Sequence, residues 1–148
     1  YGEPEKTAAC ISPEGWGTVS DAGYLDKDGY LYLSDRKDFM IISGGVNIYP
    51  QEIENQLIIH NAVADVAVFG IPNVEFGEEV KAVVQPIQWP VDGKAVERKL
   101  LIWLREFLSP VKVPRSIDFV KELPRLDNGK LYKRYLQQQY LDKAKLLS

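Results

Sequence analysis

The pattern of apolar and polar positions divides the chain into a glycine-rich first part and a more regular second part. Residues 1–34 are rich in Gly, Pro and Asp and predict short strands joined by turns. The clearest signal there is Asp28-Gly29 between two runs rich in Tyr and Leu, which is typical of an antiparallel hairpin. Residues 35–38 are all charged, and because few core contacts cross such a segment, we expect a domain boundary there.

The pattern after residue 38 predicts an α+β domain. Gly44-Gly45 interrupts an apolar run, which indicates a second hairpin, and Pro50 suits the first turn of a helix. Glu52 and Glu54 favour the N-terminal end of that helix. The elements expected are a hairpin at 39–48, a helix from Pro50, strands at 62–71 and 80–87 joined by a polar loop, a helix capped by Asp92, a strand at 116–120 and a final helix at 132–146. This order predicts a small mixed sheet packed with helices, preceded by an N-terminal β-hairpin region.

Composition narrows the class of protein. The chain has 148 residues, of which 45% are hydrophobic, and its single cysteine, Cys10, excludes a disulfide framework. No apolar run approaches the roughly 20 residues that span a bilayer, and no basic-then-apolar signal opens the chain. We therefore expect a soluble, cytoplasmic protein without a transmembrane segment.

Charge is unevenly distributed. The formal net charge is −3, yet residues 121–148 carry 7 basic and 3 acidic side chains. This basic end could contact phosphate groups or could be a solvated helix face. Because a general nucleic-acid-binding protein is usually basic and this chain has a negative net charge, nucleic-acid binding is not expected.

Several kinds of catalytic site are absent from the sequence. The only histidine, His60, stands beside Asn61 at an expected helix end and has no nucleophile motif to serve. No phosphate-binding loop of the G-x-x-x-x-G-K-[ST] type and no metal-ligand spacing occur, so no metal site is expected. A self-sufficient nucleotide enzyme is therefore not encoded by these residues.

Four features remain as candidates, and each also has an ordinary structural explanation. Asp21 could bind ribose hydroxyls or cap a turn, and Arg36 with Asp38 could act at a joint or form a surface ion pair. Gly44-Gly45 could let a ligand approach the backbone or could be a tight turn. Lys130 ends a polar loop and could be a solvent-facing lysine.

The order of these features resembles the adenylate-forming superfamily of acyl-CoA synthetases, peptide-synthetase adenylation domains and luciferases. The resemblance rests on residues 20–30 (SDAGYLDKDGY), 35–54 (DRKDFMIISGGVNIYPQEIE), 111–115 (VKVPR) and 123–130 (LPRLDNGK). Two departures are visible. Family members often have Thr-Gly where this chain has Val19-Ser20, and Gly where it has Asp35.

The resemblance implies that the chain is a piece of a larger enzyme. Residues 1–37 would be the last strands of a large N-terminal domain with the junction, and residues 38–148 a C-terminal lid domain with the family's α+β fold. The intact enzyme would be an AMP-forming acyl-CoA synthetase that joins a carboxylic acid to CoA through an acyl-adenylate. It would use ATP, Mg²⁺ and CoA, with none of these held by this fragment alone and no turnover by the fragment.

The resemblance also implies roles for individual residues. Asp21 would hold the ribose hydroxyls of ATP and AMP with help from Arg36, and Asp38 would be the hinge between two catalytic poses. Lys130 would neutralise the carboxylate and α-phosphate during adenylation. After rotation of the lid, the hairpin of Ser43, Gly44 and Gly45 would face the pantetheine arm of CoA.

Partners and alternatives follow from the same resemblance. The partners implied are the large N-terminal domain, ATP or AMP, CoA, a carboxylic acid and a protein lysine acetyltransferase that would silence the enzyme at Lys130. One alternative is an adenylation domain that loads a carrier protein. Another is a non-catalytic interaction module that has kept the fold.

Overall fold

The computed structural model describes residues 3–18, 21–36 and 39–146, which form two compact units, 1–38 and 39–148. The division lies next to the boundary expected from the charged residues 35–38. The second of the two strands in the first unit nevertheless includes two of those four charged residues, Asp35 and Arg36. Each unit is described by itself.

The first unit begins with a short helix, where the sequence analysis expected only strands and turns. Helix α1 spans Pro4–Ala9, with proline in its first turn and Glu5 near its positive end. The antiparallel pair β1 (Asp21–Leu25) and β2 (Leu31–Arg36) forms the expected hairpin. The carboxylate of Asp26 accepts the backbone N–H groups of residues 28 and 30, which shapes the turn. The prediction of a hairpin is therefore confirmed, and the prediction for residues 4–9 is wrong. Beyond this helix, an isolated antiparallel bridge joins Ile11 and Gly17 across a turn.

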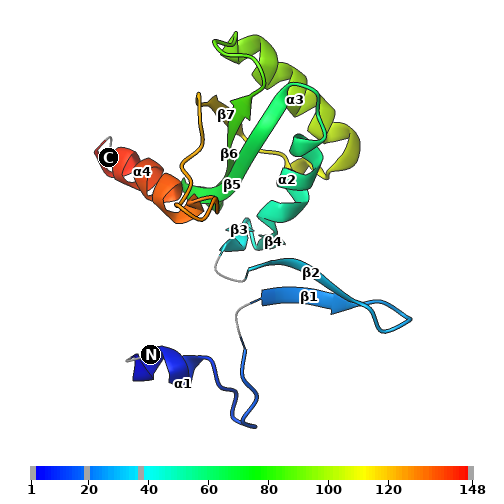
Figure 1. Cartoon of the computed structure of the whole chain (residues 1–148), viewed down its shortest axis with the longest axis vertical. Coiled ribbons are helices and arrows are strands. Elements are labelled where there is room, and N and C mark those ends of the chain that lie inside the picture. Colours follow the sequence, from blue (N-terminus) through cyan, green and yellow to red (C-terminus); the bar gives the residue numbers. More distant parts are fainter. Residues whose placement is uncertain (1–2, 19–20, 37–38, 147–148) are drawn as a thin grey trace. The chain divides into compact units, whose positions relative to one another are not determined.

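The second unit is built on a mixed five-stranded sheet (Figure 1). Its strands are β3 (Ile41–Ser43), β4 (Val46–Ile48), β5 (Val63–Asn73), β6 (Gly77–Pro86) and β7 (Ser116–Phe119). Strand β6 is central: β5 pairs antiparallel with it along its whole length, β3 pairs with it at Gly77, and β7 pairs with its residues 81–84. Only β7 runs parallel to β6, so the sheet is mixed, as expected.

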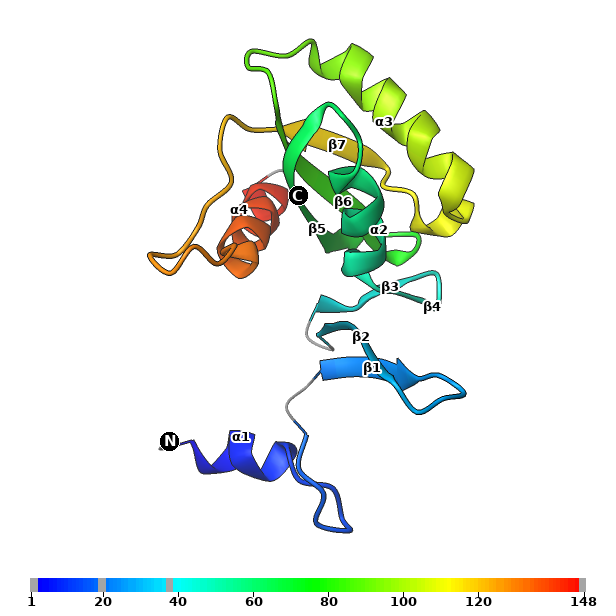
Figure 2. The same ribbon diagram turned by 45° about the vertical axis from the view of Figure 1, so that its right-hand side comes forward.

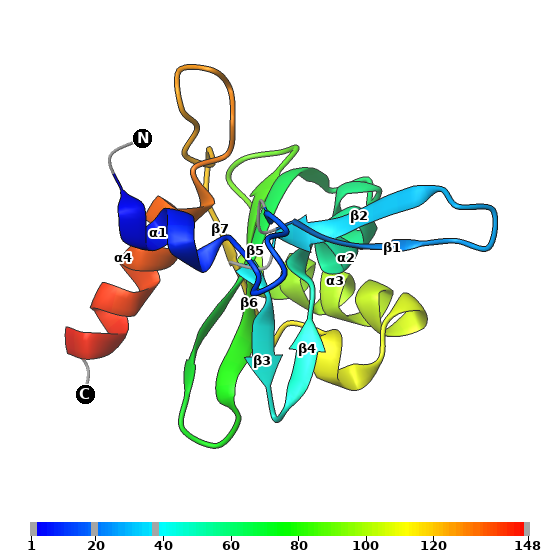
Figure 3. The same cartoon turned by 90° about the horizontal axis from the view of Figure 1, so that it is seen from below.

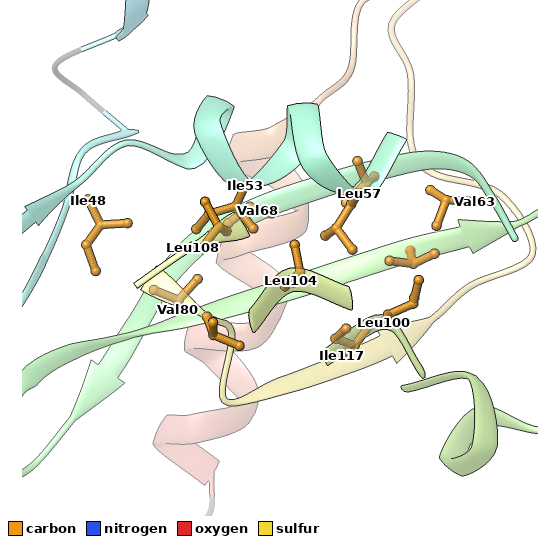
Figure 4. Packing of buried hydrophobic residues seen from close by; sticks show 14 of the residues in the cluster. Ile48, Ile53, Leu57, Val63, Val68, Val80, Leu100, Leu104, Leu108 and Ile117 are labelled. Carbon is orange, nitrogen blue, oxygen red and sulfur yellow. The ribbon is translucent and has the colours of Figure 1, made fainter. Parts of the chain in front are cut away.

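Helices cover both faces of this sheet. Helices α2 (Pro50–Ile58) and α3 (Gly93–Phe107) lie on one face and α4 (Lys133–Leu146) on the other (Figure 2). The α2/α3 side holds the larger core, and Figure 4 shows its residues meeting between helices and strands. The smaller core under α4 contains Ala67, Phe69, Val83, Leu123 and Leu136. Alternate residues of β5 and β6 serve the two cores because successive side chains of a strand point to opposite faces.

Local sequence signals explain where the helices of the second unit begin. Pro50 opens α2 at a position where its missing N–H has no intrahelical partner. The Asp92 carboxylate accepts the Ala95 N–H at 3.2 Å and caps α3. Leu100, Leu104 and Leu108 follow at the helical period and are buried.

The polar loop expected at residues 72–79 is a much shorter turn. Strands β5 and β6 extend to Asn73 and from Gly77, so only residues 74–76 join them. The Asn73 side-chain oxygen accepts the N–H groups of Glu75 and Phe76, which closes the turn. The side chain of Asn73 thus supplies an acceptor for two backbone N–H groups of the turn, which would otherwise have to bond to water.

Candidate functional site

Asp21 and Arg36, the candidate nucleotide-binding residues, are direct cross-strand partners. They pair at the open end of the β1–β2 hairpin, beside a register shift between Ala22 and Gly23. A Cβ added at Gly23 would lie 2.5 Å from the Tyr32 carbonyl oxygen, so this irregularity requires glycine. The hairpin therefore brings together two residues that are 15 positions apart in the sequence.

Asp38, the candidate hinge, lies outside the described residues. The described chain resumes at Phe39, whose ring lies 5.1 Å from the Nζ atom of Lys133. The first described residue after the expected hinge is thus attached to the second unit through α4.

The candidate CoA-facing residues form a tight two-residue turn between β3 and β4. Gly44 and Gly45 have φ values of +56° and +81°, a combination that L-amino acids with side chains rarely adopt. The Gly44 N–H donates to the Phe76 carbonyl at 2.9 Å, so this turn lies beside the β5–β6 turn (Figure 3). Ser43 is buried, whereas both glycines are exposed. The turn therefore presents bare backbone.

Ser43 is one of the residues that line a cavity of about 560 Å³. Its wall includes the charged residues Glu79, Arg105 and Arg115. The Arg115 guanidinium stands 4.6 Å above the ring of Phe76, and its Nε lies 4.0 Å from the Glu79 carboxylate. Neither Arg105 nor Arg115 was predicted from the sequence to have a role. The only signal was that Arg115 ends the motif at residues 111–115.

Lys130, the candidate catalytic residue, is carried by a small closed hairpin and not by an open loop. An isolated bridge joins Arg125 and Leu131, and the Leu126 N–H donates to the Lys130 carbonyl at 2.9 Å. The Lys130 N–H donates to the Asn128 side chain at 3.0 Å. Lys130 is exposed, and its Nζ makes no ion pair with a described residue. The backbone is therefore held while the amine faces solvent.

The two candidate reactive elements of the second unit lie far apart. The loop that carries Lys130, orange in Figures 2 and 3, and the β3–β4 turn project from opposite sides of the unit. The structure therefore brings Ser43, Gly44 and Gly45 together and separates Lys130 from them.

Two groups of charged side chains are structural features that were not predicted from the sequence. Glu54, expected only to favour a helix end, pairs with Lys133 at 2.7 Å and accepts the Val68 N–H at 2.7 Å. Both side chains of the pair are 11% exposed. The pair joins α2, β5 and α4, and its members are 79 positions apart, so no local pattern indicates it.

The second group lies under α4 and is only partly buried, since the Lys81 side chain is 8% exposed and that of Asp118 45%. The Asp118 carboxylate accepts from Lys81 Nζ and from the Tyr140 hydroxyl, each at 2.7 Å. Burial, followed by the hydrogen bond and the negative charge of Asp118, raises the pKa of Tyr140 well above its usual range. The group fastens α4 to the sheet and does not line the cavity at Ser43.

Within 3–18, 21–36 and 39–146, no group of three or more His, Cys, Asp or Glu side chains is arranged to hold a metal ion. No helix of these same segments is long and apolar enough to cross a membrane. His60 lies in the turn after α2, where its Nδ1 accepts the Ala62 N–H at 3.1 Å.

Comparison with known proteins decides the family. Residues 52–130 match the model of the AMP-binding enzyme C-terminal domain. The chain belongs to this family. It is the C-terminal domain of an adenylate-forming enzyme, and its fold is the one expected from the resemblance.

Relatives of this AMP-binding C-terminal domain include CoA ligases. A long-chain-fatty-acid–CoA ligase of Bacillus subtilis (strain 168) is 41% identical over 136 residues, which are 92% of this chain and 24% of that protein. A feruloyl-CoA synthase of an Amycolatopsis species is 41% identical over 141 residues, which are 95% of this chain and 28% of that protein. The chain therefore spans about a quarter of the length of these relatives.

Solved structures show the same fold. ATP-bound MatB from Rhodopseudomonas palustris superposes with a TM-score of 0.84 at 34% identity, over 96% of this chain and 28% of that one. The o-succinylbenzoate CoA synthetase MenE of Bacillus subtilis, in complex with its acyl-adenylate intermediate, superposes with a TM-score of 0.79 at 34% identity, over 93% of this chain and 27% of that one.

Proposed function

We propose that this AMP-binding C-terminal domain belongs to an AMP-forming acyl-CoA ligase. In the first step a carboxylate oxygen attacks the α-phosphorus of ATP, pyrophosphate leaves and an acyl-adenylate forms. In the second step the CoA thiol attacks the acyl carbon, loses its proton and releases AMP. The observation that carries the proposal is the exposed Lys130 amine on its closed hairpin, in a chain whose relatives include CoA ligases.

Lys130 is the group that we assign to the first step. Two anions, the carboxylate and the α-phosphate, must come into contact there, and their repulsion opposes the reaction. A compact ammonium between them lowers this repulsion, and it does so most strongly where water is excluded. The solvent-facing amine of Lys130 supports this assignment because no ion pair with a described residue has to break first.

The β3–β4 turn is the element that we assign to the second step. Gly44 and Gly45 present backbone without side chains, which leaves room for the thin pantetheine arm of CoA beside Ser43. The cavity that Ser43 helps to line supplies Arg105 and Arg115, two cations suited to the CoA phosphates. These guanidinium groups are a better-defined candidate than the basic C-terminal residues.

A rotation between the two steps follows from the separation of these elements. The loop that carries Lys130 and the β3–β4 turn project from opposite sides of the second unit, and we assign each step to a different pose of the lid. We assign the hinge to Asp38, between units 1–38 and 39–148. Residues 1–37 then belong to the large N-terminal domain, and residues 38–148 are the lid.

The nucleotide site would be shared with that large domain. Asp21 and Arg36, opposite each other on β1 and β2, would contact the ribose of ATP and AMP. ATP, Mg²⁺ and CoA are substrates and cofactors of the intact enzyme, and we assign none of them to residues 1–148 alone. A cytoplasmic location remains part of the proposal.

Acylation of Lys130 is a proposed means of regulation. Acetylation removes the positive charge on which the adenylation role depends. The exposed side chain is accessible to a protein lysine acetyltransferase. Full-length protein acetylated completely at Lys130 should lose acid activation, and undiminished activity would contradict this part of the proposal.

The function is tested with the full-length protein, ATP, Mg²⁺ and a panel of carboxylic acids that includes a long-chain fatty acid and ferulic acid. The ligase proposal predicts AMP and an acyl-CoA with at least one acid when CoA is the acceptor. Acyl transfer to a phosphopantetheinylated carrier protein and not to CoA would favour the carrier-loading alternative. Absence of acid-dependent AMP formation with every acid would favour a non-catalytic module.

A further inference from the structure

The hairpin that carries Lys130 is closed by hydrogen bonds between its own residues, and these bonds do not set its orientation relative to the sheet. The Gly129 N–H donates to the Leu126 carbonyl at 2.7 Å, and the Tyr132 N–H donates to the Pro124 carbonyl at 2.8 Å. These bonds set the shape of residues 124–132 and leave their orientation relative to the sheet undetermined. That orientation depends on contacts between the hairpin and the strands.

One side chain makes such a contact next to Lys130 itself. Nη1 of Arg125 donates to the Gly129 carbonyl oxygen at 2.6 Å, and Nη2 of Arg125 forms an ion pair with the Asp65 carboxylate. The carbonyl of Gly129 belongs to the peptide that immediately precedes Lys130. A single planar guanidinium thus connects strand β5 to the backbone of the candidate catalytic residue.

The partner strand adds a second point of attachment. Asp65 of β5 stands opposite Gln85 of β6, next to an irregularity in strand register. The Gln85 side-chain oxygen accepts the Leu123 N–H at 3.0 Å, and Leu123 is only 2% exposed. The cross-strand pair Asp65/Gln85 therefore holds the first arm of the hairpin at residues 123 and 125.

We propose that Arg125 and Asp65 are positioning residues for Lys130. The inference rests on the proposed function, because it states that this pair holds Lys130 in the position that adenylation requires. By tying the Gly129 peptide to β5, the pair keeps the Lys130 backbone at a fixed distance from the sheet while the lid moves as one body. Neither residue touches the reacting atoms. Their loss would displace the amine, and a displacement of about 1 Å can lower a rate by about 100-fold.

The alternative is that the pair merely contributes to folding stability. Arg125 is 46% exposed and Asp65 21% exposed, and ion pairs with that much access to water contribute little to stability. A structural role would also affect both chemical steps alike. A positioning role affects only the step that uses Lys130, so the two roles give different results.

The test uses full-length protein and four variants: Arg125→Gln, Asp65→Asn, the double variant and Asp142→Asn. Asp65→Asn retains an oxygen for the Val66 N–H that Asp65 accepts at 2.9 Å. Asp142→Asn is the matched control, since Asp142 is an exposed carboxylate on α4 whose described contact is with Gln138. Adenylation is followed as acid-dependent ATP–pyrophosphate exchange, and the second step as acyl-CoA formation from supplied acyl-adenylate.

We expect Arg125→Gln and Asp65→Asn each to lower kcat of adenylation by roughly tenfold, with KM for ATP and the rate of the second step changed less than about twofold. The double variant should be no slower than the worse single variant, because both changes remove one interaction. The control should match the wild type in both steps. Equal losses in both steps, or adenylation at the wild-type rate, would overturn the inference.

Lys130→Ala, measured in the same two assays, separates this inference from the proposed function. If the wild-type protein shows no adenylation with any acid, the proposed function fails. If adenylation survives in Lys130→Ala, the role assigned to Lys130 and the positioning role both fail while the ligase activity stands. If Lys130→Ala loses adenylation while Arg125→Gln and Asp65→Asn behave as wild type, only the positioning role fails.

Discussion

The buried pair of Glu54 and Lys133 should contribute much more to stability than the exposed pair formed two residues earlier on the same helix. Glu54 and Lys133 are 11% exposed and 2.7 Å apart, whereas Glu52 and Lys112 are 42% and 29% exposed at the same distance. Glu54→Gln keeps an acceptor for the Val68 N–H but leaves the Lys133 ammonium buried without its counter-charge. Glu52→Gln leaves Lys112 in contact with water.

The sizes of the two effects follow from burial. Removing one member of a buried ion pair costs about 3 kcal/mol, because the remaining charge is desolvated and unpaired. Removing one member of an exposed pair costs about 0.5 kcal/mol. With an m-value of about 1.5 kcal/mol/M in urea, the unfolding midpoint should fall by about 2 M for Glu54→Gln and about 0.3 M for Glu52→Gln.

The assay is urea unfolding of the 148-residue chain followed by the circular dichroism of its helices, most of which belong to residues 39–148. The double variant Glu54→Gln/Lys133→Met should be more stable than the sum of its single effects predicts, by about 2 kcal/mol, because it leaves no unpaired charge. If Glu54→Gln lowers the midpoint no more than Glu52→Gln, or if the double variant is additive, the reasoning is wrong.

Three further predictions concern other parts of the second unit. The pKa of Tyr140 is raised in the folded chain, so its hydrogen bond contributes fully to folding stability below the unfolded pKa of about 10, and this contribution is lost as the pH rises beyond it. In urea unfolding, wild type should be more stable than Tyr140→Phe by about 1 kcal/mol near neutral pH, and this difference should shrink above about pH 10. Gly45→Ala, at φ +81°, should destabilise the turn by about 1 kcal/mol and, in the full-length protein, slow acyl-CoA formation from acyl-adenylate but not ATP–pyrophosphate exchange. Asp92→Ala removes the cap of α3 and should lower the free energy of unfolding by about 1 kcal/mol, whereas Asp92→Ser should retain most of it.

Much of the second unit could be predicted because its signals are local. Gly44-Gly45 between apolar runs indicates a hairpin, and Pro50 and Asp92 mark helix starts, each within a few residues. The failures have physical reasons as well. Helix α1 has no apolar periodicity to reveal it, and the Asn73 side chain closes a turn where Pro72 suggests the end of a strand.

The candidate site was predictable only as separate motifs. The motifs that resemble the adenylate-forming superfamily identify Lys130, Gly44 and Asp21, whereas the pairing of Asp21 with Arg36 appears only in the strand register. The contact of Arg125 with Asp65 spans 60 positions and depends on how the hairpin returns to the sheet. No local pattern encodes such a contact, because it is created by tertiary packing.

The central claim, that the Lys130 charge serves the first step and not the second, is tested most directly by Lys130→Ala in the full-length protein. The account predicts that acid-dependent ATP–pyrophosphate exchange falls at least about 100-fold, the scale of losing one preorganised charge, while supplied acyl-adenylate is still converted to acyl-CoA at close to the wild-type rate. Exchange that persists in Lys130→Ala, or an equal loss of both reactions, would contradict it.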